Sequence, residues 1–137
     1  MATKVLDSWA LIAFLEDEPA AEAVEKLLAQ AAAEKHKLLL SVVNWGEIYY
    51  NTMREVSQEA AEQQARALAT LPFDIVGVGD DLAIARQAAI YKATHKMSYA
   101  DCFAAALAKL TSAELITGDP EFKLVEKEIK VVWLKPG

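Results

Sequence analysis

The chain has 137 residues, a formal net charge of -6 and a hydrophobic fraction of 54%, which predicts one domain over residues 1–137 with one sizeable core. Charged residues interrupt its apolar runs well short of the roughly 18 residues that a membrane span needs, so we expect no transmembrane helix. The negative charge argues against nucleic-acid binding through bulk positive charge, but not against an enzyme that reaches phosphates through bound cations.

The first half of the chain predicts strands that lead directly into helices. Short apolar runs mark the strands, and apolar residues three and four positions apart mark the helices. Pro19 suits the first position of the second helix, where its missing N–H is not needed. In chain order, we expect a strand over Lys4–Leu6, a helix from Trp9, a helix over 20–34, a strand over Lys37–Ser41 and a helix over Val42–Arg54.

The second half continues this alternation. The segment from Ser98 to Asp101 has the spacing of a capping box. In chain order, we expect a helix from Ser57 to about Leu71, a strand over Phe73–Val78, a helix from Gly79 to about Thr94, a helix from Ser98 through Lys109, a strand over Glu114–Thr117, a one-turn helix after Asp119 and a strand over Lys130–Leu134. Strands that alternate with helices imply an α/β fold with a parallel sheet covered on both faces.

Four acidic residues lie where an apolar segment meets a turn or a helix start: Asp7, Glu47, Asp101 and Asp119. Each has an ordinary structural explanation, because acids are favoured at helix starts. Asp7 and Asp119 would cap helices, Asp101 would be the third-position acid of its capping box, and Glu47 would lie on a helix surface. Together they span nearly the full chain, so only a folded structure could unite them in one acidic pocket.

Glu47 fits its ordinary role least well. Val43 and Tyr50 flank it one turn away on either side, and its neighbours Ile48 and Tyr49 are also apolar. This setting predicts a mostly buried side chain. A buried carboxylate needs a partner, which favours a place for Glu47 in the acidic pocket.

The fold class offers a way to bring the acids together. Asp7 and Asp119 both follow predicted strands, and open parallel sheets form their ligand crevice at the carboxyl ends of strands. Two carboxylates about 4 Å apart repel by about 1 kcal/mol in water and about 4 kcal/mol at an effective dielectric of about 20, so the cluster needs a counterion. Mg²⁺ or Mn²⁺ takes oxygen ligands and can hold a phosphate in its open positions.

Four segments resemble the acidic signature of PIN-domain nucleases: Val5-Leu6-Asp7-Ser8, the early third helix with Glu47, Ser98-Tyr99-Ala100-Asp101, and Thr117-Gly118-Asp119-Pro120-Glu121-Phe122. Their order and spacing match across the whole chain. In length and layout the chain looks most like the single-domain VapC-type toxins of toxin-antitoxin pairs. The resemblance implies a three-layer α/β/α sandwich and an Mg²⁺- or Mn²⁺-dependent endoribonuclease that leaves a 5′-phosphate and a 3′-hydroxyl.

The resemblance also implies roles for particular residues. Asp7, Glu47, Asp101 and Asp119 would form the acidic quartet that holds the metal, and Thr117 would orient ligands or water. All five would belong to the catalytic site. In this interpretation the cation is held mainly by Asp7 and Asp101, with Asp119 or Glu47 acting through water.

Glu121 occupies a place where the family often has Asp, and we expect it outside the metal's direct ligands. The resemblance further implies an RNA substrate, a VapB-type antitoxin that silences the enzyme partly by filling the acidic pocket, and a homodimer. Exposed apolar residues of the early helices are the expected dimer face: Leu11, Phe14 and Tyr50.

Other acidic α/β domains are alternatives. A haloacid-dehalogenase-type phosphatase would want a second Asp two residues after Asp7, where Trp9 stands. A receiver domain would want a lone Asp at the end of its third strand, where the chain has Gly79-Asp80-Asp81. A third alternative is a non-catalytic module whose acidic pocket is filled by an Arg or Lys of a basic partner.

Two further features bear on packing and compartment. Trp9, Trp45 and Trp133 could stack on bases, but their positions inside apolar segments favour core packing. Cys102 is the only cysteine, which excludes an internal disulfide, and its alanine-rich surroundings predict a small buried side chain. The segment from Met1 to Asp7 lacks the zones of a signal peptide, so we expect a cytoplasmic protein.

Overall fold

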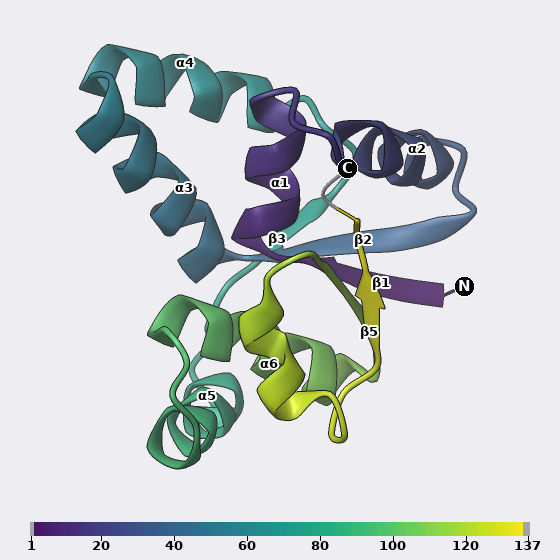
Figure 1. Ribbon diagram of the computed structural model, residues 1–137, viewed down its shortest axis with the longest axis vertical. Helices are drawn as coiled ribbons and strands as arrows, with labels where there is room; N and C mark the ends of the chain where they lie inside the picture. Colours follow the sequence, from purple (N-terminus) through teal and green to yellow (C-terminus); the bar gives the residue numbers. More distant parts are fainter. Residues whose placement is uncertain (1, 136–137) are drawn as a thin grey trace.

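Strands and helices alternate along the chain as the sequence predicts (Figure 1). The computed structural model describes residues 2–135, so the outermost ends of the predicted domain lie outside the described residues. In this range the strands are β1 (Ala2–Leu6), β2 (His36–Ser41), β3 (Asp74–Val76), β4 (Glu114–Thr117) and β5 (Val131–Trp133). The helices are α1 (Ser8–Leu15), α2 (Ala21–Ala32), α3 (Val42–Glu55), α4 (Gln58–Leu68), α5 (Ala83–Thr94), α6 (Tyr99–Thr111) and the 3₁₀ helix η1 (Pro120–Val125).

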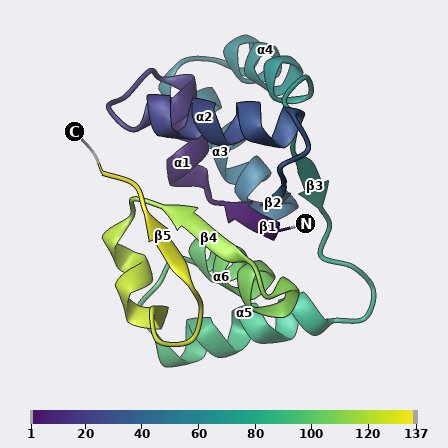
Figure 2. The ribbon, with the colours of Figure 1, turned by 90° about the vertical axis from the view of Figure 1, so that its right-hand side faces the viewer.

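The strands form one sheet in the order β3-β2-β1-β4-β5, and every neighbouring pair is parallel. Parallel strands need crossover connections, which the helices between them provide. Helices α1 and α2 cover one face of the sheet, and α5 and α6 cover the other (Figure 2). The predicted three-layer α/β/α sandwich with a central parallel sheet is confirmed.

Two apolar cores lie on opposite faces of the sheet, because successive strand residues point to opposite sides. Val5 of β1 and Leu115 of β4 pack with residues of α5 and α6. Their chain neighbours Leu6 and Ile116 pack with residues of α1 and α2. All four side chains are fully buried. Burial on both faces explains why these strands are continuous apolar runs rather than alternating ones.

The strand register places two of the candidate site residues side by side. Leu6 of β1 pairs with Ile116 of β4, so the residues that follow, Asp7 and Thr117, lie together at the carboxyl edge of the sheet. From β1 the chain continues to β2 on one side, whereas β4 lies on the other side of β1. This switch in strand order is where open parallel sheets form their ligand crevice.

Several element boundaries differ from the sequence prediction, and three of the differences are described here. Pro19 lies in a turn, and α2 begins two residues later at Ala21 without a side-chain cap. Helix α5 begins at Ala83 because Leu82 before it adopts a left-handed backbone conformation with φ of 66°. Strand β3 is limited to Asp74–Val76, the residues that pair with β2.

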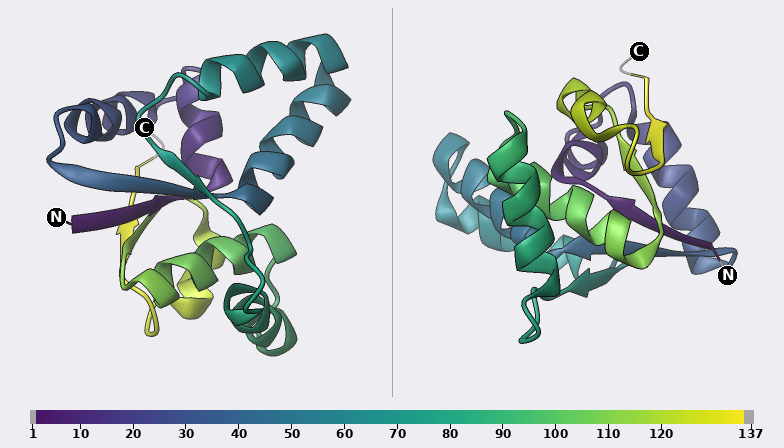
Figure 3. Two further views of the ribbon diagram at one scale, coloured as in Figure 1. Left: turned by 180° about the vertical axis from the view of Figure 1, so that it is seen from behind. Right: turned by 90° about the horizontal axis from the view of Figure 1, so that it is seen from below.

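Helices α3 and α4 project as a pair from the carboxyl side of the sheet (Figure 3). Two side-chain hydrogen bonds join them: the Tyr49 hydroxyl donates to Glu62, and the Thr52 hydroxyl donates to Gln64, each at 2.7 Å. Glu47 lies on α3. Among residues 2–135, no helix has the length and apolar character needed to cross a bilayer.

The predicted exposure of the dimer face is wrong at Leu11, which is fully buried in the core beside α2. Phe14 is half-buried and packs against the same core. Tyr50 is exposed, at 45%. The difference arises because α1 is short and packs closely on the sheet, so its apolar residues fill the core. Cys102 is buried as predicted.

Candidate metal centre

Asp7 combines a structural role with a place in the acidic pocket. It caps α1, because its Oδ1 accepts a hydrogen bond from the Ala10 N–H at 2.9 Å. Its Oδ2 accepts a hydrogen bond from the Thr117 hydroxyl. The side chain is completely buried. Burial, together with the charges of Asp119 and Glu47, raises the pKa of the Asp7 carboxyl to about 7, although these two hydrogen bonds lower it.

Thr117 connects Asp7 to the loop that carries Asp119. Its hydroxyl donates to Asp7 and accepts a hydrogen bond from the Asp119 N–H at 3.0 Å. Asp119 then caps η1, because its Oδ1 accepts a hydrogen bond from the Glu121 N–H at 2.9 Å. Thr117 is fully buried. Two predicted site residues therefore share one buried hydroxyl, which fixes the start of η1 relative to the end of β1.

Asp101 lies in the first turn of α6, and the start of this helix differs from the predicted capping box. Ser98 Oγ accepts a hydrogen bond from the Asp101 N–H at 3.2 Å, as the motif requires. The reciprocal bond is made by Glu121, whose Oε1 accepts from the Ser98 N–H. The Asp101 carboxylate therefore remains available to the pocket. Burial, the charge of Asp119 and a hydrogen bond with Glu121 raise its pKa to about 9.

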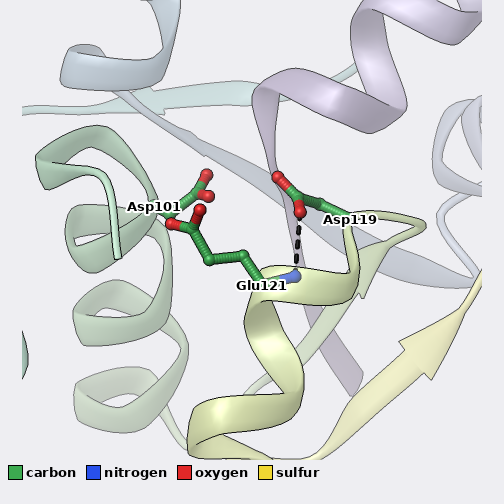
Figure 4. A group of neighbouring side chains, drawn as sticks. All are labelled: Asp101, Asp119 and Glu121. Carbon is green, nitrogen blue, oxygen red and sulfur yellow. Dashed lines mark hydrogen bonds between the residues drawn. The ribbon is translucent and has the colours of Figure 1, made fainter. Parts of the chain in front are cut away.

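Three carboxylates converge in front of the sheet edge (Figure 4). One oxygen from each of Asp101, Asp119 and Glu121 lies within 4.8 Å of the other two. Figure 4 shows Asp101 and Glu121 pointing toward each other from α6 and η1, with Asp119 beside them. Glu121, which we expected outside the direct ligands, thus lies among the oxygens best placed to share one ion.

Glu47 and Asp7 border this trio from two other elements. Glu47 is half-buried, less than the sequence predicts, and lines a cavity of about 300 Å³ together with Asp101, Asp119 and Glu121. Neither Asp7 nor Glu47 belongs to the group within 4.8 Å. Their carboxylates still interact, because the Asp7 charge acts on Asp101 and the Glu47 charge acts on Asp7. The fold therefore gathers all four predicted acids in one place.

Asn44 is a buried polar residue that the sequence interpretation missed. It is completely buried. Its Nδ2 donates to the Ala100 carbonyl oxygen at 3.2 Å, and its backbone carbonyl oxygen accepts from the Ser8 hydroxyl at 3.4 Å. It thereby joins the starts of α1, α3 and α6, which carry or adjoin three of the acids. Its signal in the sequence is a polar side chain one turn before Glu47 in an apolar stretch.

The three tryptophans divide between core and pocket. Trp45 and Trp133 pack against the two cores, as predicted. Trp9 packs against neither core and instead lines the acidic cavity next to Ile12. The polar residues of the cavity wall are Ser8, Asn51 and Ser98. The cavity thus has one wall of carboxylates and one wall that is apolar.

The donor set fits a hard divalent cation. Carboxylate oxygens are the ligands that Mg²⁺ and Mn²⁺ prefer, and the three converging acids come from a helix start and a short connection that hydrogen bonds hold in place. Without a cation, burial and the neighbouring negative charges favour the protonated forms of Asp7 and Asp101, as their raised pKa values indicate. A divalent ion would replace those protons.

Comparisons with known proteins bear on the fold and the family of the chain. A model of the PIN domain matches residues 4–128. No curated protein sequence matches the chain. A DNA-bound VapBC structure from Salmonella typhimurium has a TM-score of 0.74 and 12% identity, covering 96% of this chain and 98% of that chain. VapBC2 from Rickettsia felis, bound to a DNA fragment from its promoter, has a TM-score of 0.72 and 13% identity, covering 97% and 99%.

A third similar structure is VapC20 from Mycobacterium tuberculosis, a toxin that cleaves the sarcin-ricin loop. Its TM-score is 0.68 at 17% identity, with 89% of this chain and 94% of that chain covered. At these identities the likeness concerns the fold.

Proposed function

This chain belongs to the PIN domain family, and on that premise we propose that it is a divalent-metal-dependent endoribonuclease that hydrolyses RNA phosphodiester bonds. The observation that carries the proposal is the convergence of Asp101, Asp119 and Glu121 at the switch point of a parallel sheet, with Asp7 and Glu47 beside them. The membership also argues against the receiver-like and phosphatase-like alternatives. We treat residues 1–137 as one PIN-like domain.

The acids have separate tasks in the proposed centre. Asp101, Asp119 and Glu121 would hold Mg²⁺ or Mn²⁺, and Asp7 and Glu47 would complete the negative charge around it. When bound, such an ion polarises a phosphoryl oxygen and lowers the pKa of water enough for attack on phosphorus.

Thr117 is a positioning residue in this proposal. Its hydroxyl keeps one oxygen of Asp7 turned toward the loop of Asp119. Asn44 positions the start of α6, and with it Asp101, through its bond to the Ala100 carbonyl oxygen. Both residues are buried and contribute no net charge. They hold acids that repel one another in a fixed arrangement, which lets a cation bind without further rearrangement of the chain.

The cellular role that we propose is that of a cytoplasmic toxin paired with a VapB-type antitoxin. Support comes from the fold, which resembles that of chains in VapBC complexes from Rickettsia felis and Salmonella typhimurium. A basic side chain of the antitoxin would suit the acidic wall of the cavity.

We also propose a homodimer that uses the exposed Tyr50 and Met53 of α3. Light scattering is expected to give twice the chain mass at micromolar concentration, and a monomer mass would contradict the dimer.

Cleavage of end-labelled RNA by the purified protein tests the proposed activity. We expect cutting of structured or unstructured RNA in Mg²⁺ or Mn²⁺ and none in EDTA, because the acids cannot bind a phosphate without a cation. Asp101→Asn, prepared identically, is expected to lose at least about 100-fold in rate and controls for contaminating ribonuclease. Equal cutting by parent and variant would trace the activity to a contaminant. Absence of cutting with either metal would favour the non-catalytic acidic-pocket alternative.

A further inference from the structure

Trp9 occupies an unusual place for a tryptophan of this chain. The other two, Trp45 and Trp133, pack against the cores on either side of the sheet. Trp9 lies in the first turn of α1, is half-buried, and lines the acidic cavity together with Asp101 and Asp119. A large aromatic side chain that avoids both cores and borders a polar cavity needs another explanation than core packing.

Gly118 is shaped to receive this indole ring. A Cβ atom placed on Gly118 would lie 2.2 Å from Cη2 of Trp9 and 2.5 Å from both Cζ2 and Cζ3. Because the three distances are nearly equal, the added atom would stand over the face of the ring rather than beyond its edge. One face of the indole therefore rests on the backbone of Gly118, next to Asp119. Only glycine permits this approach.

The cavity then presents two kinds of wall that match the two parts of a nucleotide. The carboxylates of Glu47, Asp101, Asp119 and Glu121 form the wall where a cation can hold a phosphate. Trp9 and Ile12 form the apolar wall. A base attached to the held phosphate would reach this wall, since both walls border one cavity of about 300 Å³. Base stacking on aromatic rings tolerates any sequence, which suits a site with few basic residues.

We propose that Trp9 is the base-stacking residue of the site, and that it holds an unpaired base of single-stranded RNA next to the phosphate at the acidic cluster. The proposal rests on the proposed nuclease function, because it takes RNA as the ligand of the cavity. Gly118 is the positioning residue, since its missing side chain lets the ring lie flat beside Asp119. The indole is thus fixed by the same loop that carries one of the acids.

Binding of two oligomers tests the proposal without requiring hydrolysis. The probes are a fluorescent oligoadenylate and an abasic ribose-phosphate oligomer of the same length, titrated by fluorescence anisotropy in Ca²⁺. Ca²⁺ takes carboxylate and phosphate oxygens as Mg²⁺ does but activates water poorly, so the oligomers stay intact while every acid of the site is retained. Trp9→Leu keeps an apolar side chain but removes the aromatic face, and is expected to weaken oligoadenylate binding about tenfold while leaving the abasic oligomer within about twofold.

Two companion variants separate stacking from folding. Trp133→Leu removes a tryptophan that lies outside the cavity lining, and is expected to leave binding of both oligomers unchanged. Gly118→Ala keeps Trp9 but drives a methyl group into its ring, and is expected to weaken oligoadenylate binding selectively. Circular dichroism and melting curves verify that each variant is folded.

Several results would overturn the proposal. If Trp9→Leu weakens both oligomers equally, Trp9 supports the loop of Asp119 rather than a base. If it weakens neither, or if the parent binds neither oligomer, the cavity does not hold a nucleotide in this way. A parent that shows base-dependent binding but never cuts RNA would contradict the nuclease and leave the stacking site standing. The two proposals therefore fail by different observations.

Discussion

Asp7→Asn is expected to abolish metal-dependent RNA cleavage and, at the same time, to raise the melting temperature of the metal-free protein. The side chain is completely buried between the Ala10 N–H and the Thr117 hydroxyl. Asparagine has nearly the same shape and can still accept the bond from Ala10. It carries no charge, so it removes both the negative charge that a cation needs and the cost of burying that charge.

Cleavage is expected to fall at least about 100-fold, because losing an acid of the centre should cost more than losing a group that only supports one. In EDTA at about pH 8, where a carboxyl with a pKa of about 7 is largely ionised, the melting temperature is expected to rise by roughly 3–8 °C. A substitution that lowers activity but raises stability is characteristic of a residue whose charge serves the site and whose packing does not require that charge.

Asp17→Asn is the matched control for this experiment. Asp17 is exposed in the turn after α1, and its φ of 51° is a conformation that asparagine also tolerates. The same change of charge at this position is expected to leave both cleavage and melting temperature unchanged. If Asp7→Asn cleaved RNA at the parent rate, Asp7 would have no part in the mechanism. If the Asp7→Asn variant melted at a lower temperature than the parent, the hydrogen bonds of the Asp7 carboxylate would contribute more to stability than the burial of its charge costs.

The sheet and its helices could be predicted because the local signals are strong and agree. Leu38 to Leu40 is buried from both sides, so it is a continuous apolar run that a surface strand would not show. Ser41, Ser57 and Ser98 each accept a hydrogen bond at the helix starts where the sequence places them. The position of Asp7 at the end of β1 follows from the same local pattern.

The composition of the acidic centre could be predicted only in part, because it depends on strand order and on side-chain directions. Local sequence does not state that β4 lies beside β1, yet this pairing is what brings Thr117 to Asp7. Nor does it state that Glu121 takes over the capping bond to Ser98 and so frees Asp101. These long-range partners differ by more than twenty positions in sequence, and no periodicity relates them.

Trp9 shows the same limit for apolar residues. Its place among the apolar residues of α1 fits a core residue, and two of the three tryptophans do pack there. What distinguishes Trp9 is contact with Gly118, a residue of the connection after β4. A glycine in a turn has an ordinary explanation, and only the three-dimensional contact shows that its missing Cβ makes room for a ring.

The metal-free protein is expected to lose thermal stability as the pH rises from about 5 to about 9, and a divalent cation is expected to restore it. In the folded chain the pKa of Asp7 is about 7 and that of Asp101 about 9, against an ordinary value of 3.8. Both carboxyls bind protons more tightly when folded, so their stabilisation is complete below about pH 4 and is lost as the pH rises through about 7 and about 9.

Each acid contributes a slope of at most about 1.4 kcal/mol per pH unit up to its folded pKa, so a fall in melting temperature of at least about 10 °C is expected in EDTA. Glu114 changes the stability with pH in the opposite direction, because its hydrogen bond from Lys130 lowers its pKa. Starting at about pH 5 keeps most of that titration outside the measured range. The fall in stability therefore reports on the buried acids of the centre.

Melting curves recorded in EDTA, Mg²⁺ and Mn²⁺ across this pH range test both the loss of stability and its recovery by the cation. The cation is expected to raise the melting temperature little at about pH 5, where protons compete for the same oxygens, and most at about pH 8. Replacing both Asp7 and Asp101 by Asn should flatten the curve in EDTA and remove the response to metal, whereas Asp17→Asn should keep both. A cation effect of equal size at both pH values would place the ion away from these carboxyls. The direction in which the melting temperature changes with pH distinguishes the two roles of these acids. Acids that only capped helices would have lowered pKa values and would stabilise the protein as the pH rises.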